Sequence, residues 1–168
     1  MEDQKFPNPL KLDIGCGEEK LLGYQSVDLY LPADYADDIC SLKSFPDNVA
    51  DEVRTFHVLE HLPDQKLVLA MDNVFRILKP GGVWVIEVPD LIWVLQNFID
   101  TPEIARWGWK MQTIFGLQNH EGEYHRTGFS IERLGSMLKE SKFVKIEMLN
   151  YFSDKYDQGV IDAIAFKP

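Results

Sequence analysis

The stretch LDIGCGEEKLLGYQSVDLY, Leu12–Tyr30, holds an apolar run, two glycines one residue apart and an acid that closes a second apolar run. The glycines are Gly15 and Gly17, and the acid is Asp28. In the dinucleotide-binding fold about 20 residues separate the glycines from the ribose-binding acid, because a full helix lies between them. Here Asp28 follows Gly17 by only eleven positions. This spacing predicts a binding loop for a ligand that does not need the helix.

Strand-like and helix-like segments alternate along the rest of the chain. The apolar runs predicted to form strands are Leu10–Ile14, Ser26–Leu29, Glu52–His57, Val83–Val88, Phe143–Leu149 and Val160–Phe166. Predicted helices cover Asp64–Leu78, Leu91–Ile99 and Pro102–Phe115, and a last one is N-capped by Ser130. Strands that first alternate with helices and then end in a hairpin predict an α/β fold with a mostly parallel sheet.

Aromatic side chains recur at helical spacing in the third quarter of the chain. They are Trp93, Phe98, Trp107, Trp109 and Phe115. This spacing favours core packing or the lining of a pocket over a surface that stacks on nucleic-acid bases.

The composition predicts a single globular domain over residues 1–168, with 45% hydrophobic and 12% aromatic residues. A net charge of −10 argues against nucleic acid as a partner, because phosphate binding depends on Lys and Arg. The first residues, MEDQKFPNPL, do not resemble a signal peptide, and no apolar run is long enough to cross a bilayer. We therefore expect a cytoplasmic protein with no membrane partner and with reduced thiols at its two cysteines.

The order of four motifs carries a family resemblance. LDIGCG, VDLY, FPDNVADEVRTFHVLEHLP and ILKPGGVWVIEVPD follow one another as in class I S-adenosylmethionine-dependent methyltransferases. The chain resembles most closely the small, methyltransferase type 11-like group with a VLEH turn and an LKPGG helix end. The resemblance implies a Rossmann-like fold, with a mostly parallel central sheet, an antiparallel last strand and a shortened first helix. It also implies methyl transfer from S-adenosyl-L-methionine, with S-adenosyl-L-homocysteine as the product.

The chemistry of this cofactor fits the short spacing in the opening stretch. Adenosylmethionine has no phosphate, so the loop need not present a long helix N-terminus to a pyrophosphate. The helix can shrink to a turn over Glu18–Leu22, and Gly15 and Gly17 let the backbone approach the ligand closely. Asp28 is placed to accept hydrogen bonds from both ribose hydroxyls.

The resemblance also implies individual cofactor contacts. Asp13 helps to hold the methionine amino group, Asp38 with Ile39 meets the adenine edge, and the backbone at His57 contacts the amino-acid part. The full expected cofactor site is Asp13, Gly15, Cys16, Gly17, Asp28, Leu29, Asp38, Ile39 and His57. One departure is the loss of the family's usual third glycine, since Glu18 and Glu19 follow Gly17. This departure keeps open a non-catalytic adenosyl-ligand-binding or regulatory module, and it disfavours a nicotinamide-dependent oxidoreductase.

The acceptor side of the site is predicted from polar residues in two segments. His125, with His120 beside it, is the candidate general base, because a histidine titrates near neutrality. Two alternatives remain, namely positioning without a base and a plain polar loop. The spacing of these histidines is not a recognised ligand pattern, so no metal is expected. Glu60, His61 and Asp90 are expected in the pocket, although the Glu60–His61 pair favours a role in fixing the loop. The expected acceptor is a small molecule or a sugar-type compound, and a homodimer is one way to complete the pocket.

Overall fold

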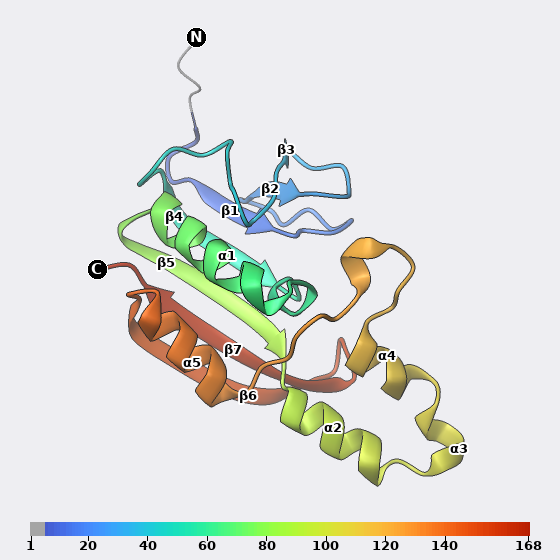
Figure 1. Ribbon diagram of the computed structural model, residues 1–168. Coiled ribbons are helices and arrows are strands. Elements are labelled where there is room, and N and C mark those ends of the chain that lie inside the picture. The colour runs from blue at the N-terminus through green and yellow to red at the C-terminus, as the bar shows by residue number, and fades with distance from the viewer. Residues whose placement is uncertain (1–5) are drawn as a thin grey trace.

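The computed structural model describes residues 6–168, whose strands form one seven-stranded sheet in the order β3-β2-β1-β4-β5-β7-β6 (Figure 1). The strands are β1 Lys11–Ile14, β2 Gln25–Asp28, β3 Tyr35–Ala36, β4 Ala50–Phe56, β5 Leu78–Pro89, β6 Val144–Ser153 and β7 Gln158–Phe166. Strands β1 to β5 pair in parallel, whereas β7 runs antiparallel to both β5 and β6. The expected mostly parallel sheet with an antiparallel last strand is confirmed.

The longer helices fall into two groups. The helices are α1 Asp64–Ile77, α2 Leu91–Asp100, α3 Glu103–Arg106, α4 Trp109–Phe115 and α5 Ile131–Glu140, with short 3-10 turns η1 Leu59–His61 and η2 Glu121–Glu123. Helices α1 and α5 lie over the same side of the sheet, whereas α2 to α4 extend beyond its end (Figure 1). No helix within residues 6–168 has the length and apolar character that crossing a bilayer requires.

The helix boundaries differ from the predicted ones where backbone geometry decides them. No helix forms between β1 and β2, where the chain makes only turns, so the predicted shortening is complete. Helix α1 ends at Ile77 and β5 begins at the next residue, because Pro80 and its neighbouring glycines lie within an extended strand. The predicted helix over Pro102–Phe115 is divided at Gly108 into α3 and α4. The N-cap at Ser130 is confirmed, since its side chain accepts from the Arg133 amide at 3.3 Å.

The aromatic residues of the α2–α4 region are more exposed than their spacing predicted. Trp107 is 64% exposed and Phe115 is 48% exposed, so neither belongs to the core. The expectation of core packing is wrong for these two, because Trp107 follows α3 and Phe115 ends α4, and both helices extend past the sheet instead of covering it (Figure 1). Trp93 packs against Phe152 of β6, with ring centroids 5.5 Å apart.

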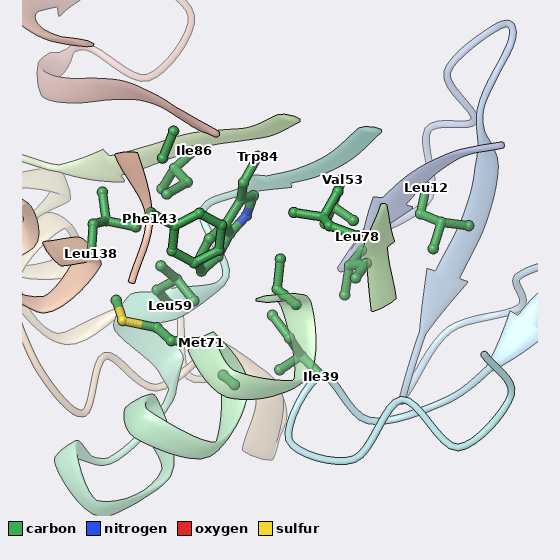
Figure 2. Close-up of a cluster of buried hydrophobic side chains, with 14 of the residues drawn as sticks. Leu12, Ile39, Val53, Leu59, Met71, Leu78, Trp84, Ile86, Leu138 and Phe143 are labelled. Atoms are coloured by element: carbon green, nitrogen blue, oxygen red, sulfur yellow. The ribbon is translucent and has the colours of Figure 1, made fainter. Parts of the chain in front are cut away.

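The main hydrophobic core contains side chains of the sheet and of helices α1 and α5 (Figure 2). Val53 and Trp84 of the central strands, Met71 of α1 and Leu138 of α5 are at most 1% exposed. The Trp84 indole carries the one polar group of this set, and its Nε1 donates to Thr55 Oγ1 at 2.9 Å. This buried hydrogen bond joins β4 to β5.

Replacing Thr55 with valine should lower the free energy of unfolding by about 1–3 kcal/mol. Valine keeps the shape but leaves the buried Trp84 N–H without its acceptor. Urea denaturation of the purified variants measures the change, and Thr55→Ser is the control because it retains a hydroxyl. A Thr55→Val protein as stable as wild type would show that the indole finds another acceptor.

Candidate functional site

A cavity of about 500 Å³ opens at the carboxyl ends of β1, β2 and β4. This is where ligands bind in open α/β sheets, since the loops that follow the strands converge there. The expected cofactor residues found in its wall are Gly15, Gly17, Asp28, Leu29, Asp38, Ile39 and His57. The wall also contains residues that the sequence did not single out, among them Tyr30 and Lys66.

The two loop glycines have different reasons to be glycine. Both adopt positive φ, 70° at Gly15 and 62° at Gly17, which L side chains rarely adopt. A Cβ at Gly15 would lie 2.4 Å from Val58 Cγ2, so this residue permits close packing of β1 against the turn after β4. A Cβ at Gly17 would meet no atom of residues 6–168 within 4 Å. Gly17 therefore leaves open space at the cavity wall.

Asp28 links the loop after β1 to the loop after β2 at the cavity. Its Oδ2 accepts from the Gly17 amide at 3.2 Å, and its Oδ1 accepts from the amides of Tyr30 and Leu31 at 2.8 and 2.9 Å. The side chain is ionisable, 8% exposed and part of the cavity wall. Because a carboxylate has about four lone-pair sites, Oδ2 still has capacity to accept from a ligand hydroxyl.

Asp13 and Cys16 lie beside the cavity and not in its wall. Asp13 is 2% exposed and accepts from Arg54 Nη1 at 2.7 Å, so its carboxylate joins β1 to β4. Burial raises the pKa of Asp13, against the lowering effect of Arg54. The Cys16 thiol is half-buried and lies 3.4 Å from the carbonyl oxygen of Gly17. Both residues therefore support the loop at Gly15–Gly17 from outside the cavity wall.

A second cavity of about 170 Å³ adjoins the first. His57, His61 and Glu123 line both cavities. Further wall residues come from the turn after β4, from α4 and the loop after it, and from the β6–β7 connection; they include Glu60, Trp109, Thr113, His125, Tyr156 and Gln158. No local sequence signal marks Tyr156 and Gln158, because only the fold of the last hairpin brings them here.

Main-chain hydrogen bonds bring His125 to the Glu60–His61 pair. The amides of Arg126 and Thr127 donate to the carbonyl of Glu60 at 2.8 and 3.2 Å. The rings of His61 and His125 are 5.0 Å apart between centroids, in an edge-to-face arrangement. Segments more than 60 residues apart in the chain thus meet at the wall of the smaller cavity.

The remaining predicted residues, His120 and Asp90, lie elsewhere. His120 lies in the wall of the larger cavity, with its ring 5.6 Å from that of Tyr30, and it is separate from the His61–His125 pair. Asp90 lines neither cavity. Its carboxylate caps α2 by accepting from the amides of Ile92 and Trp93, and it also accepts from Asn150. We therefore leave Asp90 out of the acceptor site.

A buried charge network lies under the boundary between the two cavities. His57 Nδ1 is 3.0 Å from Glu60 Oε1, and its Nε2 is 3.1 Å from Glu87 Oε1. Burial by itself would lower the pKa of His57, but the two carboxylates raise it to about 9, so the ring is an imidazolium at neutral pH. Burial acts to raise the pKa of Glu60, yet His57 holds it below its usual range. This ion triad fixes the turn after β4 that separates the cavities.

Asp162 of β7 lies beside this network, where its negative charge is disfavoured. Burial and the negative charge of Glu87 raise its pKa to about 6, and the His57 charge offsets only part of this effect. A carboxyl whose pKa is higher in the folded state destabilises that state as pH rises from the unfolded value of about 4 to about 6. Tyr151 of β6 also faces this group and donates to Glu87 at 2.7 Å.

Asp162→Asn should therefore raise the free energy of unfolding at pH 7.5, and the gain should fade as the pH falls towards 4. The amide removes the charge that the folded state disfavours, while the protonated wild-type carboxyl at low pH has no such charge. Urea denaturation of both proteins across this pH range tests the difference. Asp72→Asn on the exposed side of α1 is the control. A stability gain that is equal at pH 4 and pH 7.5 would contradict the raised pKa.

Comparison with known proteins places this architecture in a family. Residues 5–147 match the family model described as a methyltransferase domain. The chain belongs to this methyltransferase family. No protein with a curated description matches it.

Solved structures share the Rossmann-like methyltransferase fold. One is an S-adenosylmethionine-dependent methyltransferase from Archaeoglobus fulgidus, with a TM-score of 0.64 and 20% identity over 94% of this chain and 85% of that one. Another is the 1,6-didemethyltoxoflavin-N1-methyltransferase of Burkholderia thailandensis, with a TM-score of 0.65 and 17% identity, covering 94% of this chain and 70% of that one. A phosphoethanolamine N-methyltransferase from Haemonchus contortus gives a TM-score of 0.60 and 18% identity; 94% of this chain spans 48% of its length.

Proposed function

We propose that this methyltransferase-family protein transfers a methyl group from S-adenosylmethionine to a small-molecule acceptor. The observation that carries the proposal is the pair of adjoining cavities at the carboxyl edge of the sheet. The larger cavity has a volume typical of sites for cofactor-sized ligands, which range from about 300 to 1,000 Å³. The smaller one meets it at His57 and His61, where a methyl group can pass from one ligand to the other.

Each part of the cofactor has a matching group in the larger cavity. The ribose hydroxyls donate to Asp28, whose Oδ2 retains a free lone pair. The adenine lies by Asp38 and Ile39, where a buried apolar side chain adjoins a polar loop. The methionine part lies against the loop at Gly17, where the missing side chain gives it room. In this orientation the sulfonium points towards the smaller cavity.

The reaction is an in-line displacement at the methyl carbon. A lone pair of the acceptor forms the new bond to carbon as the carbon–sulfur bond breaks, and the electron pair of that bond stays on sulfur. The acceptor also loses a proton when its attacking atom carries one. Because the protein forms no covalent bond, alignment of the acceptor, carbon and sulfur supplies most of the acceleration.

The dimensions and the charge of the site favour a small acceptor. The smaller cavity, about 170 Å³, holds a compact group and not a folded macromolecule. The net charge of −10 disfavours a nucleic-acid phosphate backbone. An acceptor of small-molecule or sugar type, carrying a hydroxyl or an amine, fits both constraints.

Formation of adenosylhomocysteine is the readout that tests methyl transfer without knowledge of the acceptor. The wild-type protein is incubated with adenosylmethionine and with size-fractionated extract compounds, and the product is quantified by mass spectrometry. We expect at least one fraction below about 1 kDa to support turnover by wild type and not by Gly17→Val. Binding of adenosylmethionine with no turnover on any fraction would favour the non-catalytic binding module.

A further inference from the structure

Three potential ligand groups converge at the wall of the smaller cavity. One carboxylate oxygen of Glu60 and one ring nitrogen each of His61 and His125 lie within 4.8 Å of one another. Glu60 is 1% exposed, and its Oε1 lies 3.0 Å from His57 Nδ1. Its Oε2 is buried and has no hydrogen-bond partner among residues 6–168. Because an unpartnered buried oxygen is costly, Oε2 points to a ligand that would satisfy it.

Main-chain contacts hold the two histidines beside the carboxylate. His61 Nδ1 lies 3.2 Å from the carbonyl oxygen of Tyr124, and the main-chain amide of His125 donates to the carbonyl of Phe115 at 3.0 Å. A neutral imidazole that donates one N–H to a carbonyl presents its other nitrogen as a lone pair. Histidines that bind metals are oriented in this way, and their carboxylate partners are likewise hydrogen-bonded from behind. His57 supplies that contact for Glu60.

We propose that Glu60, His61 and His125 bind a divalent transition-metal ion, with Zn²⁺ as the best match. Two imidazoles and one carboxylate form a ligand set of catalytic zinc sites, whereas Ca²⁺ and Mg²⁺ take oxygen ligands. With bonds of about 2.0–2.2 Å, the ligands of a tetrahedral ion lie about 3.3–3.6 Å apart, so the side chains need to approach by about 1.5 Å at most. All three residues line the smaller cavity, so the remaining position of the ion faces that space.

This assignment changes the role of His125. The sequence led us to expect a general base and no metal, because the spacing of its histidines matches no recognised pattern of metal ligands. The ligands here are brought together by the fold, through the hydrogen bonds from the 126–127 amides to the Glu60 carbonyl. In the proposed site a ring nitrogen of His125 binds the ion and is not available to accept a proton.

The chemical consequence rests on the proposed methyl transfer. An acceptor hydroxyl bound to the ion would lose its proton to solvent water more readily, because the ion would stabilise the lone pair left on the oxygen. That lone pair forms the bond to the methyl carbon as the carbon–sulfur bond breaks, and the electron pair of the broken bond stays on sulfur. The step needs no oxidant or reductant, because only the acceptor, the cofactor and water take part in it.

Metal binding is tested on the full chain, after dialysis against a chelator and its removal. Zn²⁺ is titrated by calorimetry, and Co²⁺ is titrated in parallel because its visible absorption reports the ligand geometry. We expect one ion per chain for wild type. His61→Ala and His125→Ala should each weaken Zn²⁺ binding by about 100-fold or more and should lose the Co²⁺ band. Both side chains are only partly buried, and thermal melting verifies that the variants fold.

His120→Ala is the matched control, because His120 lies in the same segment but outside the three-ligand cluster. It should bind Zn²⁺ within about twofold of wild type. A wild type that binds neither ion at 100-fold excess, or a His120→Ala that loses binding as fully as His125→Ala, would overturn the proposed site. Adenosylhomocysteine binding is measured separately without metal. If it binds while Zn²⁺ does not, the metal site is wrong and the cofactor site of the proposed function stands; the reverse result rejects that cofactor site and keeps the metal site.

Discussion

Gly17→Val should abolish detectable binding of adenosylhomocysteine while leaving a folded protein. A Cβ at this position meets no atom of the described residues within 4 Å, so the branched side chain enters the open cavity that the ligand would occupy. The positive φ of 62° adds backbone strain of about 1–2 kcal/mol, which a folded domain can tolerate. Calorimetric titration measures the affinity, and far-UV circular dichroism measures folding.

Gly23→Val is the control that separates the effect of backbone strain from the effect of filling the cavity. Gly23 has a φ of 86° and open space at its Cβ, but it does not line the larger cavity. It should lose similar stability and keep wild-type affinity. If both variants lose the ligand equally, or if Gly17→Val binds normally, the loop at Gly17 does not contact the cofactor.

Asp28→Ala should weaken adenosylhomocysteine binding by about 10- to 150-fold, which corresponds to about 1.5–3 kcal/mol. The change removes the acceptor for the ribose hydroxyls and also releases the Gly17, Tyr30 and Leu31 amides that Asp28 holds. Both effects act on the same cavity wall, so the loss should exceed that of a single exposed contact. Competition titration on protein of verified fold gives the affinity.

Asp34→Ala is the matched control for Asp28, since Asp34 also anchors backbone in this region. Its carboxylate accepts from the Ser26 amide and hydroxyl at 2.9 Å, but it does not line the larger cavity. It should lower stability and leave affinity within about threefold of wild type. Equal losses of affinity in the two variants would mean that Asp28 acts only by holding the loop.

Residues that line the larger cavity could be predicted from the sequence because their signals are local. Gly15, Gly17 and Asp28 lie within one strand–loop–strand unit, and the structure places all three in the wall of the larger cavity. The order of strands and helices likewise predicted the parallel sheet. Strand β3 was missed because two paired residues, Tyr35–Ala36, carry no periodicity.

The walls of the smaller cavity were harder to predict from the sequence because long-range contacts form them. Glu60 and His125 meet through main-chain hydrogen bonds between distant segments, and no spacing rule encodes such a meeting. Asp90 was expected in the pocket from its position after β5, but a strand end is also a helix start, and its carboxylate caps α2. Helical spacing of aromatics was equally ambiguous, since Trp109 lines the smaller cavity while Trp107 is 64% exposed.

The most direct test of the account is a calorimetric titration of the wild-type protein with adenosylhomocysteine, with NAD titrated in parallel. We predict one bound adenosylhomocysteine per chain, a melting temperature that rises with its concentration because the ligand binds only the folded state, and no heat from NAD. A wild-type protein that shows neither heat nor a change in melting temperature with adenosylhomocysteine, or that binds NAD instead, would contradict the assignment of the larger cavity to the methyl donor.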